Sequence, residues 1–317
     1  MKEVTNFKHE MIWQRNHDKV EERKKGVSGF FDKMSMEKIW ISGAEGHIGS
    51  ALVHLLADCR YKFIATDKRE VDITDWKAVH SFCKISRPDI IINCSGITDL
   101  QECEQNPDLA FAVNAVGVRN LAQEAAEIGA KLIQMSTDDV FGTTENNAPL
   151  NEFEQIAPRS VYGKSKAAGE KFVRALTNRY VIIRSSWVYG LGRDYISTVL
   201  TAAEKGGTFV AASNQFSSPT SAKELVKVLK QFIDNEYYGT YHVTCKGFCS
   251  RYEYAKEILR LTNKEGQVKV EPYFDEANER PSYSVLDNMM IRISGIEEPK
   301  EWKTALEEYL KETGGNE

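Results

Sequence analysis

The sequence lacks any apolar run near the roughly 20 residues that a membrane-spanning helix needs. It also lacks an excess of positive charge: the formal net charge of its 317 residues is -5, with acidic and basic residues interspersed. General binders of nucleic acid or membrane surfaces need a basic footprint, so the composition argues against both classes. The first residues lack the apolar core of a secretory signal, and we expect none.

The six cysteines are scattered and form no set of paired metal ligands. Cys245 and Cys249, with His242 upstream, lack the second ligand pair of a zinc site. We therefore expect no metal site built from these side chains. Scattered thiols are typical of a reducing cytoplasm, which is where we expect this protein.

Residues 1–36 differ in character from the rest of the chain. A charged run at residues 18–25 precedes Gly26 and the apolar pair Phe30 and Phe31. One or two amphipathic helices fit this pattern, with Gly26 as a break. The segment is either a loosely packed extension or a contact for a partner or a second copy of the chain.

From residue 37 onward, short apolar segments alternate with helical patterns. Strands are predicted at residues 38–42, 63–66, 90–92, 132–135 and 181–183, and helices near residues 48–56, 76–85 and 107–128. Strands that are apolar on both faces and separated by helices form a parallel sheet covered on both sides. We predict a doubly wound α/β fold of the Rossmann type in residues 37–190. A smaller substrate lobe in residues 191–317 would be interleaved with it.

Three glycines follow the first predicted strand. Gly43, Gly46 and Gly49 are spaced Gly-x-x-Gly-x-x-Gly and open an apolar helix. Glycine permits a tight turn and lets a pyrophosphate approach the amides at a helix N-terminus, where the helix dipole favours negative charge. We predict a dinucleotide-binding turn that includes His47 and Ile48. The alternative is a glycine-rich turn without a ligand.

The end of the second strand carries conflicting signals about the cofactor. Asp67 stands where a carboxylate accepts hydrogen bonds from the adenosine ribose, which favours NAD. Lys68 and Arg69 follow directly and would instead hold the 2′-phosphate of NADP. We therefore expect dual use of NAD and NADP.

Two more segments are expected beside the cofactor. Ligands of open parallel sheets bind at the carboxyl ends of the strands. Asp72 and Ile73 would lie beside the adenine, and Cys94, Ser95 and Gly96 would pass the cofactor closely at the end of the third strand.

A phenol and an ammonium are placed four residues apart, on one helix face, at Tyr162 and Lys166. Thr137 ends the preceding strand and could donate a hydrogen bond to a substrate carbonyl oxygen. We expect Lys166 to lower the pKa of Tyr162 toward the working pH, so that Tyr162 acts as general acid, and also to hold the nicotinamide ribose. The same spacing recurs at Tyr252 and Lys256, but that pair follows no such strand end and is expected on a helix surface.

With these motifs the chain resembles the extended short-chain dehydrogenase/reductases, and within them the dTDP-4-dehydrorhamnose reductase family. The similarity covers residues 37–312. It is carried by residues 43–49, 71–75, 113–117, 136–138, 184–190, 218–222 and 280–287, together with Tyr162 and Lys166.

The resemblance implies that Thr137, Tyr162 and Lys166 form a catalytic triad and that Trp187 lies near the sugar ring. It implies reduction of the 4-keto group of a nucleotide-linked deoxysugar. It further implies a homodimer and, in some members, a magnesium ion. The expected partner is a nucleotide sugar, and neither nucleic acid nor membrane is expected.

The sequence departs from the family pattern where substrate should bind. Asp139 stands where the family usually has tyrosine, and Asn214 and Ser217 replace the usual Asp and Gly. Asp194 and Tyr195 replace the usual Asn and Phe. We expect Asp139 to face the substrate, where its carboxylate would favour a sugar with another hydroxyl or amino group.

Two other functions stay open on the sequence. Asp138 and Asp139 beside Thr137 provide the added carboxylates that an epimerase or dehydratase of the same superfamily recruits. A non-catalytic, NAD(P)-binding regulatory subunit is the second alternative, because the methionine adenosyltransferase beta subunit resembles the same reductases.

Overall fold

The computed structural model describes residues 37–57, 61–142, 147–190, 192–276 and 280–314. The extension expected at residues 1–36 lies outside these ranges. Six strands form a parallel sheet in the order β2-β1-β3-β4-β5-β10. They are β1 (Lys38–Ser42), β2 (Lys62–Thr66), β3 (Ile90–Asn93), β4 (Lys131–Thr137), β5 (Tyr180–Ser185) and β10 (Gly239–His242). The predicted doubly wound parallel fold is confirmed.

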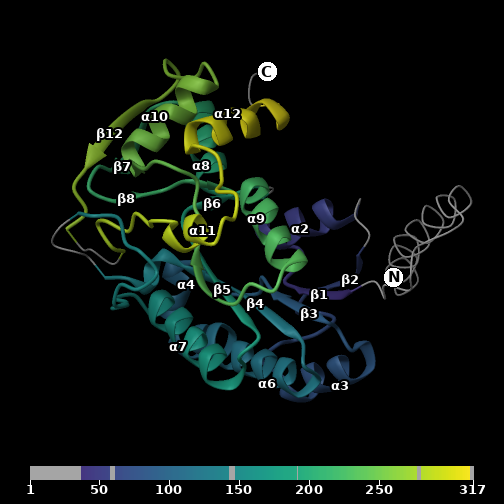
Figure 1. Ribbon diagram of the computed structural model, residues 1–317. Helices are drawn as coiled ribbons and strands as arrows, with labels where there is room; N and C mark the ends of the chain where they lie inside the picture. The colour runs from purple at the N-terminus through teal and green to yellow at the C-terminus, as the bar shows by residue number, and fades with distance from the viewer. Residues whose placement is uncertain (1–36, 58–60, 143–146, 191, 277–279, 315–317) are drawn as a thin grey trace, which may run out of the picture.

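Helices cover both faces of this sheet (Figure 1). In β1, Ile39 and Ile41 pack with α2 (His47–Ala57) and α9 (Ala222–Asp234), while Trp40 points to the opposite face. That opposite face is covered by α3 (Trp76–Ser86), α6 (Val118–Ile128) and α7 (Val161–Leu176). Burial on both sides explains why the strands read as continuous apolar runs.

The helix expected at residues 107–128 contains a π-helical turn. It consists of α5 (Pro107–Phe111), the π turn η1 (Ala112–Gly117) and α6, and it follows α4 (Leu100–Gln105). Gly117 is required here, since a Cβ on it would lie 2.7 Å from the Ile73 side chain. Such π turns are frequent at functional sites. The sequence predicted the extent of the helical segment but not this turn.

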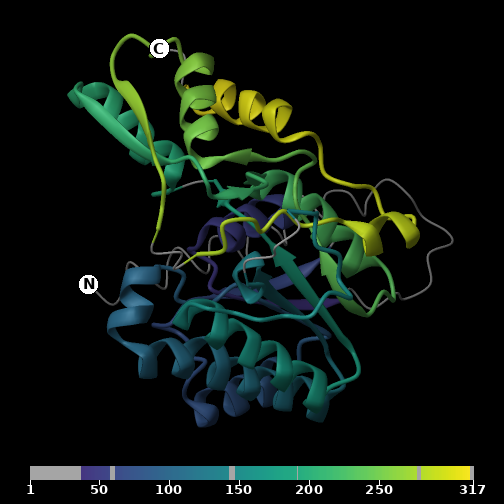
Figure 2. The same cartoon turned by 90° about the vertical axis from the view of Figure 1, so that its left-hand side faces the viewer.

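Part of the chain beyond residue 190 returns to the main sheet. Strand β10 pairs with β5, and α9 packs beside α2. The rest builds a smaller lobe above the sheet (Figure 2), with its own buried core of residues such as Val199, Ile258 and Leu306. Its larger elements are α8 (Tyr195–Lys205), β7 (Thr208–Ala212), α10 (Arg251–Leu261), β12 (Lys269–Tyr273) and α12 (Trp302–Glu312).

Short elements complete the described structure. They are the 3-10 turn η2 (Asp138–Val140), β6 (Val188–Tyr189), β8 (Phe216–Ser217), β9 (Thr220–Ser221), β11 (Cys249–Ser250) and α11 (Met289–Ile293). Strand β6 pairs with β9, and β8 pairs with β11. Within the described ranges, no helix is both long and apolar enough to cross a membrane.

Candidate active site

The glycine turn lies between β1 and α2, as predicted. Gly43 has φ +77°, and a Cβ on it would lie 2.5 Å from the Ser95 backbone nitrogen. A Cβ on Gly49 would lie 2.1 Å from the Gly43 oxygen, so both positions exclude a side chain. Gly46 is exposed, and a Cβ there would meet only the Gly43 oxygen at 3.5 Å. The first amides of α2, from His47 onward, lack intrahelical acceptors, so an open cradle with free donors fits a pyrophosphate.

Asp67 follows β2 and is tied to the glycine turn. Its Oδ2 accepts a hydrogen bond from the Glu45 backbone nitrogen at 2.9 Å. Burial raises the pKa of this carboxyl above its ordinary value. Lys68 and Arg69 are exposed beside it. Carboxylate and cations therefore share the edge where an adenosine ribose would lie.

Asp72 and Ile73 lie in the connection between β2 and α3. The Asp72 Oδ1 accepts hydrogen bonds from the backbone nitrogen and the hydroxyl of Thr74. The Ile73 side chain is buried in the core beside Gly117. Its backbone oxygen accepts from Asn120 at 2.9 Å. Ile73 thus anchors the connection between β2 and α3 to the protein core.

Cys94, Ser95 and Gly96 follow β3 and lie between the glycine turn and α7. Ser95 Oγ lies 2.8 Å from the Ser42 hydroxyl oxygen. A Cβ on Gly96 would lie 3.0 Å from Asn114 Oδ1 and 3.7 Å from Lys166 Nζ. Burial raises the pKa of the Cys94 thiol to about 12, so it stays neutral. The segment passes close to Lys166.

Asn114 is a supporting residue that the sequence pattern did not assign. It lies in the π turn, and its Nδ2 donates to Ile97 O at 2.9 Å and to Ser165 Oγ at 3.0 Å. Its Oδ1 accepts from Ile97 N at 3.0 Å. One buried amide thereby fastens the loop after β3 to α7.

The structure brings Thr137, Tyr162 and Lys166 together. Thr137 ends β4, and Tyr162 lies in the first turn of α7, which Ser160 caps by accepting from Gly163 N at 3.0 Å. The Thr137 hydroxyl donates to Asp138 Oδ1 at 3.2 Å and lies close enough to the Tyr162 phenol to lower its pKa. Lys166 Nζ donates to Met135 O at 2.6 Å. All three residues are buried.

The expectation that Lys166 lowers the pKa of Tyr162 is wrong in this structure. Burial raises the pKa of Tyr162 above its ordinary value, the charge of Asp139 raises it further, and the Thr137 hydroxyl offsets part of the rise. The ammonium of Lys166 binds the Met135 carbonyl rather than the phenol. Burial lowers the pKa of Lys166 to about 8.

Two buried carboxylates lie beside this group. Asp139 N donates to Thr137 Oγ1 at 3.2 Å, and Asp139 Oδ2 lies 3.7 Å from Arg280 Nη1. Asp138 Oδ2 accepts from Ser217 Oγ at 3.0 Å and from Ser284 Oγ at 2.5 Å. Burial and, next, the charge of Asp139 raise the pKa of Asp138 to about 6. Asp138 thus fastens the end of β4 to the smaller lobe.

Trp187 lies beside Arg251, whose neighbour Arg280 pairs with Asp139 next to Thr137. Its backbone is strained, with φ +41°, a value uncommon for a bulky residue. The guanidinium carbon of Arg251 lies 3.6 Å from the indole ring centre. Burial lowers the pKa of Arg251 to about 10, and the positive charge of Arg280 contributes. The sequence assigned no role to Arg251 or Arg280, because only the fold brings these distant positions together.

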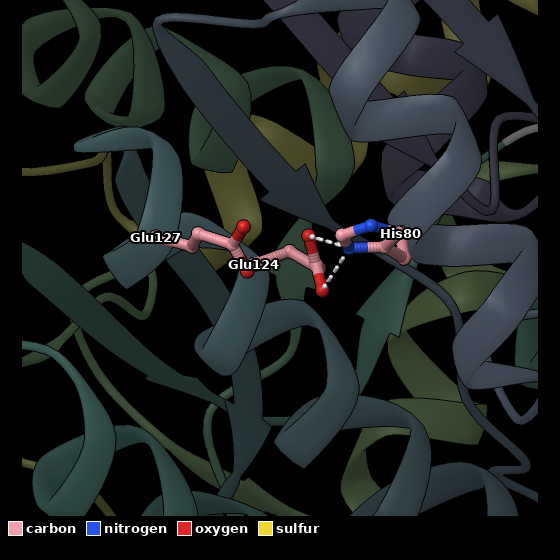
Figure 3. Close-up of side chains that lie close together, drawn as sticks. All are labelled: His80, Glu124 and Glu127. Atoms are coloured by element: carbon pink, nitrogen blue, oxygen red, sulfur yellow. Dashed lines mark hydrogen bonds and ion pairs between the residues drawn. The ribbon is translucent and has the colours of Figure 1, made fainter.

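A separate polar cluster lies on the helices of one sheet face. His80 of α3 points toward Glu124 of α6, with Glu127 nearby (Figure 3). His80 Nδ1 lies 3.1 Å from both Glu124 carboxylate oxygens. That nitrogen is therefore already engaged, and we interpret the cluster as a link between the two helices.

Comparisons with known proteins cover nearly the whole described chain. The family model described as RmlD substrate binding domain matches residues 36–314. The spore coat polysaccharide biosynthesis protein SpsK of Bacillus subtilis is 38% identical over 283 residues, which are 87% of this chain and 98% of that protein.

Two crystal structures of dTDP-4-dehydrorhamnose reductases are also similar. The Clostridium acetobutylicum structure is 39% identical, with a TM-score of 0.84 over 87% of this chain and 99% of that one. The Bacillus anthracis structure, in complex with NADP, is 35% identical, with a TM-score of 0.83 and the same coverage.

The glycine turn yields a paired prediction. Gly49→Ala should lower the free energy of unfolding by roughly 1–3 kcal/mol, because its Cβ would collide with a backbone oxygen. It should also weaken NADPH binding. Gly46→Ala should keep wild-type stability, since its Cβ meets only an ordinary contact, yet weaken NADPH by placing a methyl group on the open cradle. Urea denaturation measures the free energy of unfolding of each variant, and fluorescence titration measures its affinity for NADPH. Wild-type NADPH affinity in both variants would contradict a pyrophosphate site here.

Proposed function

This chain belongs to the dTDP-4-dehydrorhamnose reductase family of the extended short-chain dehydrogenase/reductases, and we propose that it reduces the 4-keto group of a nucleotide-linked deoxysugar. The observation that carries this proposal is the meeting of Thr137, Tyr162 and Lys166 at the end of β4. The open glycine cradle lies along the same sheet edge.

Three residues of the chain have separate roles in the proposed reaction. The nicotinamide of NADPH or NADH supplies the hydride when bound. Tyr162 gives its phenolic proton to the carbonyl oxygen. Its raised pKa means that the phenol is protonated at neutral pH but is a weaker acid than free tyrosine, so the proton transfer depends on the negative charge that hydride transfer places on that oxygen. Thr137 would donate a hydrogen bond to the same oxygen after its hydroxyl turns away from Asp138 Oδ1, which accepts it at 3.2 Å in this structure. Lys166 holds the nicotinamide ribose, and Gly96 leaves room beside it.

The smaller lobe supplies groups suited to a nucleotide sugar. Arg251 and Arg280 are partly buried cations near Trp187 and Asp139, respectively, and guanidinium groups suit phosphate oxygens. Trp187 would meet the apolar side of a deoxysugar with the part of its ring that Arg251 leaves uncovered. Asp139 would accept a hydrogen bond from a sugar hydroxyl or amino group.

The two alternatives receive less support. An epimerase or dehydratase would need a free carboxylate beside Thr137. Asp138 already accepts hydrogen bonds from Thr137, Ser217 and Ser284, and Asp139 pairs with Arg280 at 3.7 Å. A non-catalytic subunit has no need for a buried Thr-Tyr-Lys group at the sheet edge that also carries the glycine cradle. Both alternatives predict NAD(P) binding without net reduction of a ketosugar.

We extend the proposal to a cytoplasmic homodimer, with magnesium as an auxiliary ion as in some family members. The cysteines within the described ranges are free thiols, which supports a reducing compartment. Leu109 and Phe111 of α5 are exposed apolar side chains that a second copy of the chain could cover. The His80 cluster gives no support for magnesium as a part of the site, since it joins α3 to α6 and includes none of Thr137, Tyr162 and Lys166.

Replacing the proposed acid tests the reaction. Tyr162→Phe should lower turnover of a nucleotide-linked 4-keto-deoxysugar by about 10²-fold or more while keeping NADPH affinity, because only the proton donor is lost. Tyr252→Phe is the matched control, because Tyr252 has the same four-residue spacing to a lysine. The ammonium of that lysine, Lys256, lies over the Tyr252 ring, with Nζ 5.5 Å from the ring centre. Both variants are followed by NADPH absorbance. Near-normal turnover in Tyr162→Phe would refute the assignment.

Cofactor choice is tested at Asp67. Asp67→Asn can still accept from Glu45 N, so the turn should persist while the negative charge is lost. NADPH should gain relative to NADH, because a carboxylate repels a 2′-phosphate. Kd values for both cofactors measure this. In the wild-type protein we expect dual use, with a preference below about 100-fold, or 2.8 kcal/mol. A larger wild-type preference would refute dual use.

Asp139 tests substrate selection. Asp139→Asn removes a charge that would repel a diphosphate, so KM for a nucleotide sugar should fall several-fold while NADPH affinity stays unchanged. Asp108→Asn makes the same chemical change at an exposed position on α5 and should alter neither value. Steady-state kinetics over several nucleotide sugars give the comparison. A KM that rises for one sugar alone would instead show that Asp139 binds that sugar.

A further inference from the structure

Glu170 is a buried carboxylate behind the catalytic residues. It lies on α7, one helical turn beyond Lys166, and is only 1% exposed. Its Oε1 accepts from Ser136 Oγ at 2.6 Å and from Arg184 Nε at 2.9 Å. Its Oε2 accepts from Nη2 of Arg184 and of Arg174, each at 2.8 Å. Burial alone would raise the pKa of Glu170, but these partners hold it below its ordinary value, so the carboxylate is charged.

Two partners of Glu170, Ser136 and Arg184, lie in a row with His242 across three neighbouring strands. Ser136 of β4 is in register with Arg184 of β5, and Arg184 is in register with His242 of β10. Arg184 Nη1 lies 3.4 Å from His242 Nε2, while His242 Nδ1 lies 3.0 Å from Leu150 O. Nδ1 therefore carries the proton and Nε2 accepts from Arg184. Burial lowers the pKa of His242 to about 3, so the ring is neutral.

We propose that Glu170 is a positioning residue for the reduction described above: its carboxylate, held by Ser136 and Arg184, fixes α7 against the ends of β4 and β5. The proposal rests on the proposed function for its kinetic part only. Ser136 directly precedes Thr137, and Glu170 shares a helix face with Tyr162 and Lys166. A shift of α7 along the sheet would therefore separate Lys166 and Tyr162 from Thr137.

Glu170 also supplies negative charge toward Lys166. Burial lowers the pKa of Lys166, and Glu170 is the largest opposing influence. The other groups that face Lys166 are the thiols of Cys94 and Cys103, whose pKa values burial raises to about 12 and about 11. Both thiols are neutral near pH 7. Among these groups, Glu170 is therefore the one that is charged near pH 7 and favours the protonated form of Lys166.

The test compares three variants with the wild-type protein. Glu170→Gln keeps the shape and removes the charge. It should lower kcat at least tenfold and move the alkaline limb of the kcat profile to lower pH, because Lys166 then loses its proton more easily. Ser136→Ala removes one hydrogen bond and no charge, so it should lower kcat about threefold or more without moving that limb. Arg174→Gln removes a half-exposed partner of the same carboxylate and should change little.

A second readout does not depend on turnover. Acetylation of Lys166 by trace acetic anhydride, followed against pH by peptide mass spectrometry, reports its pKa, and exposed Lys164 is the internal control. A Lys166 titration midpoint at lower pH in Glu170→Gln than in the wild-type protein supports the proposal. This result stands even if neither protein reduces a nucleotide sugar, and in that case only the proposed function fails. A folded Glu170→Gln variant with wild-type Lys166 titration and kcat profile would overturn it. If Glu170→Gln does not fold, wild-type kcat in Ser136→Ala would overturn it equally.

Discussion

The shared carboxyl edge of the parallel sheet is the constraint on which the rest of the structure depends. Because β1, β3, β4 and β5 run the same way, the residues that follow them meet although they are far apart in sequence. The segments after β1 and β3 lie so close together that a Cβ on Gly43 would collide with Ser95. Lys166 of α7 likewise donates a hydrogen bond to the backbone of β4. A cofactor cradle and a proton donor are therefore neighbours as a consequence of topology.

Burial at this edge determines the electrostatics of the site. Charged groups removed from water are costly unless they are paired and hydrogen-bonded. Glu170 has four hydrogen bonds from three side chains, and Asp138 is surrounded by hydroxyl groups. The same burial raises the pKa of Tyr162 and lowers that of Lys166. The phenol of Tyr162 therefore keeps its proton at neutral pH, and its donation depends on the negative charge that develops on the carbonyl oxygen during reduction.

The sequence predicted the elements whose signals are local. Five strands were identified because they are apolar on both faces, and the Tyr-x3-Lys pair was placed by helical spacing. Strand β10 was missed because Gly-Thr-Tyr-His carries no apolar run and joins the sheet at its edge. The direction of the Tyr162 pKa shift was wrong because it depends on where Lys166 Nζ points. Arg251 and Arg280 meet Trp187 and Asp139 only through the fold.

The central claim is that one site binds the reduced cofactor and reduces a ketosugar. It is tested most directly by supplying NADPH deuterated at either C4 position together with a nucleotide-linked 4-keto-deoxysugar, then locating the label in the product by mass spectrometry and NMR. The account predicts deuterium at C4 of the sugar, from one face of the nicotinamide only. Tight NADPH binding without any transfer of label to a range of such sugars would contradict it.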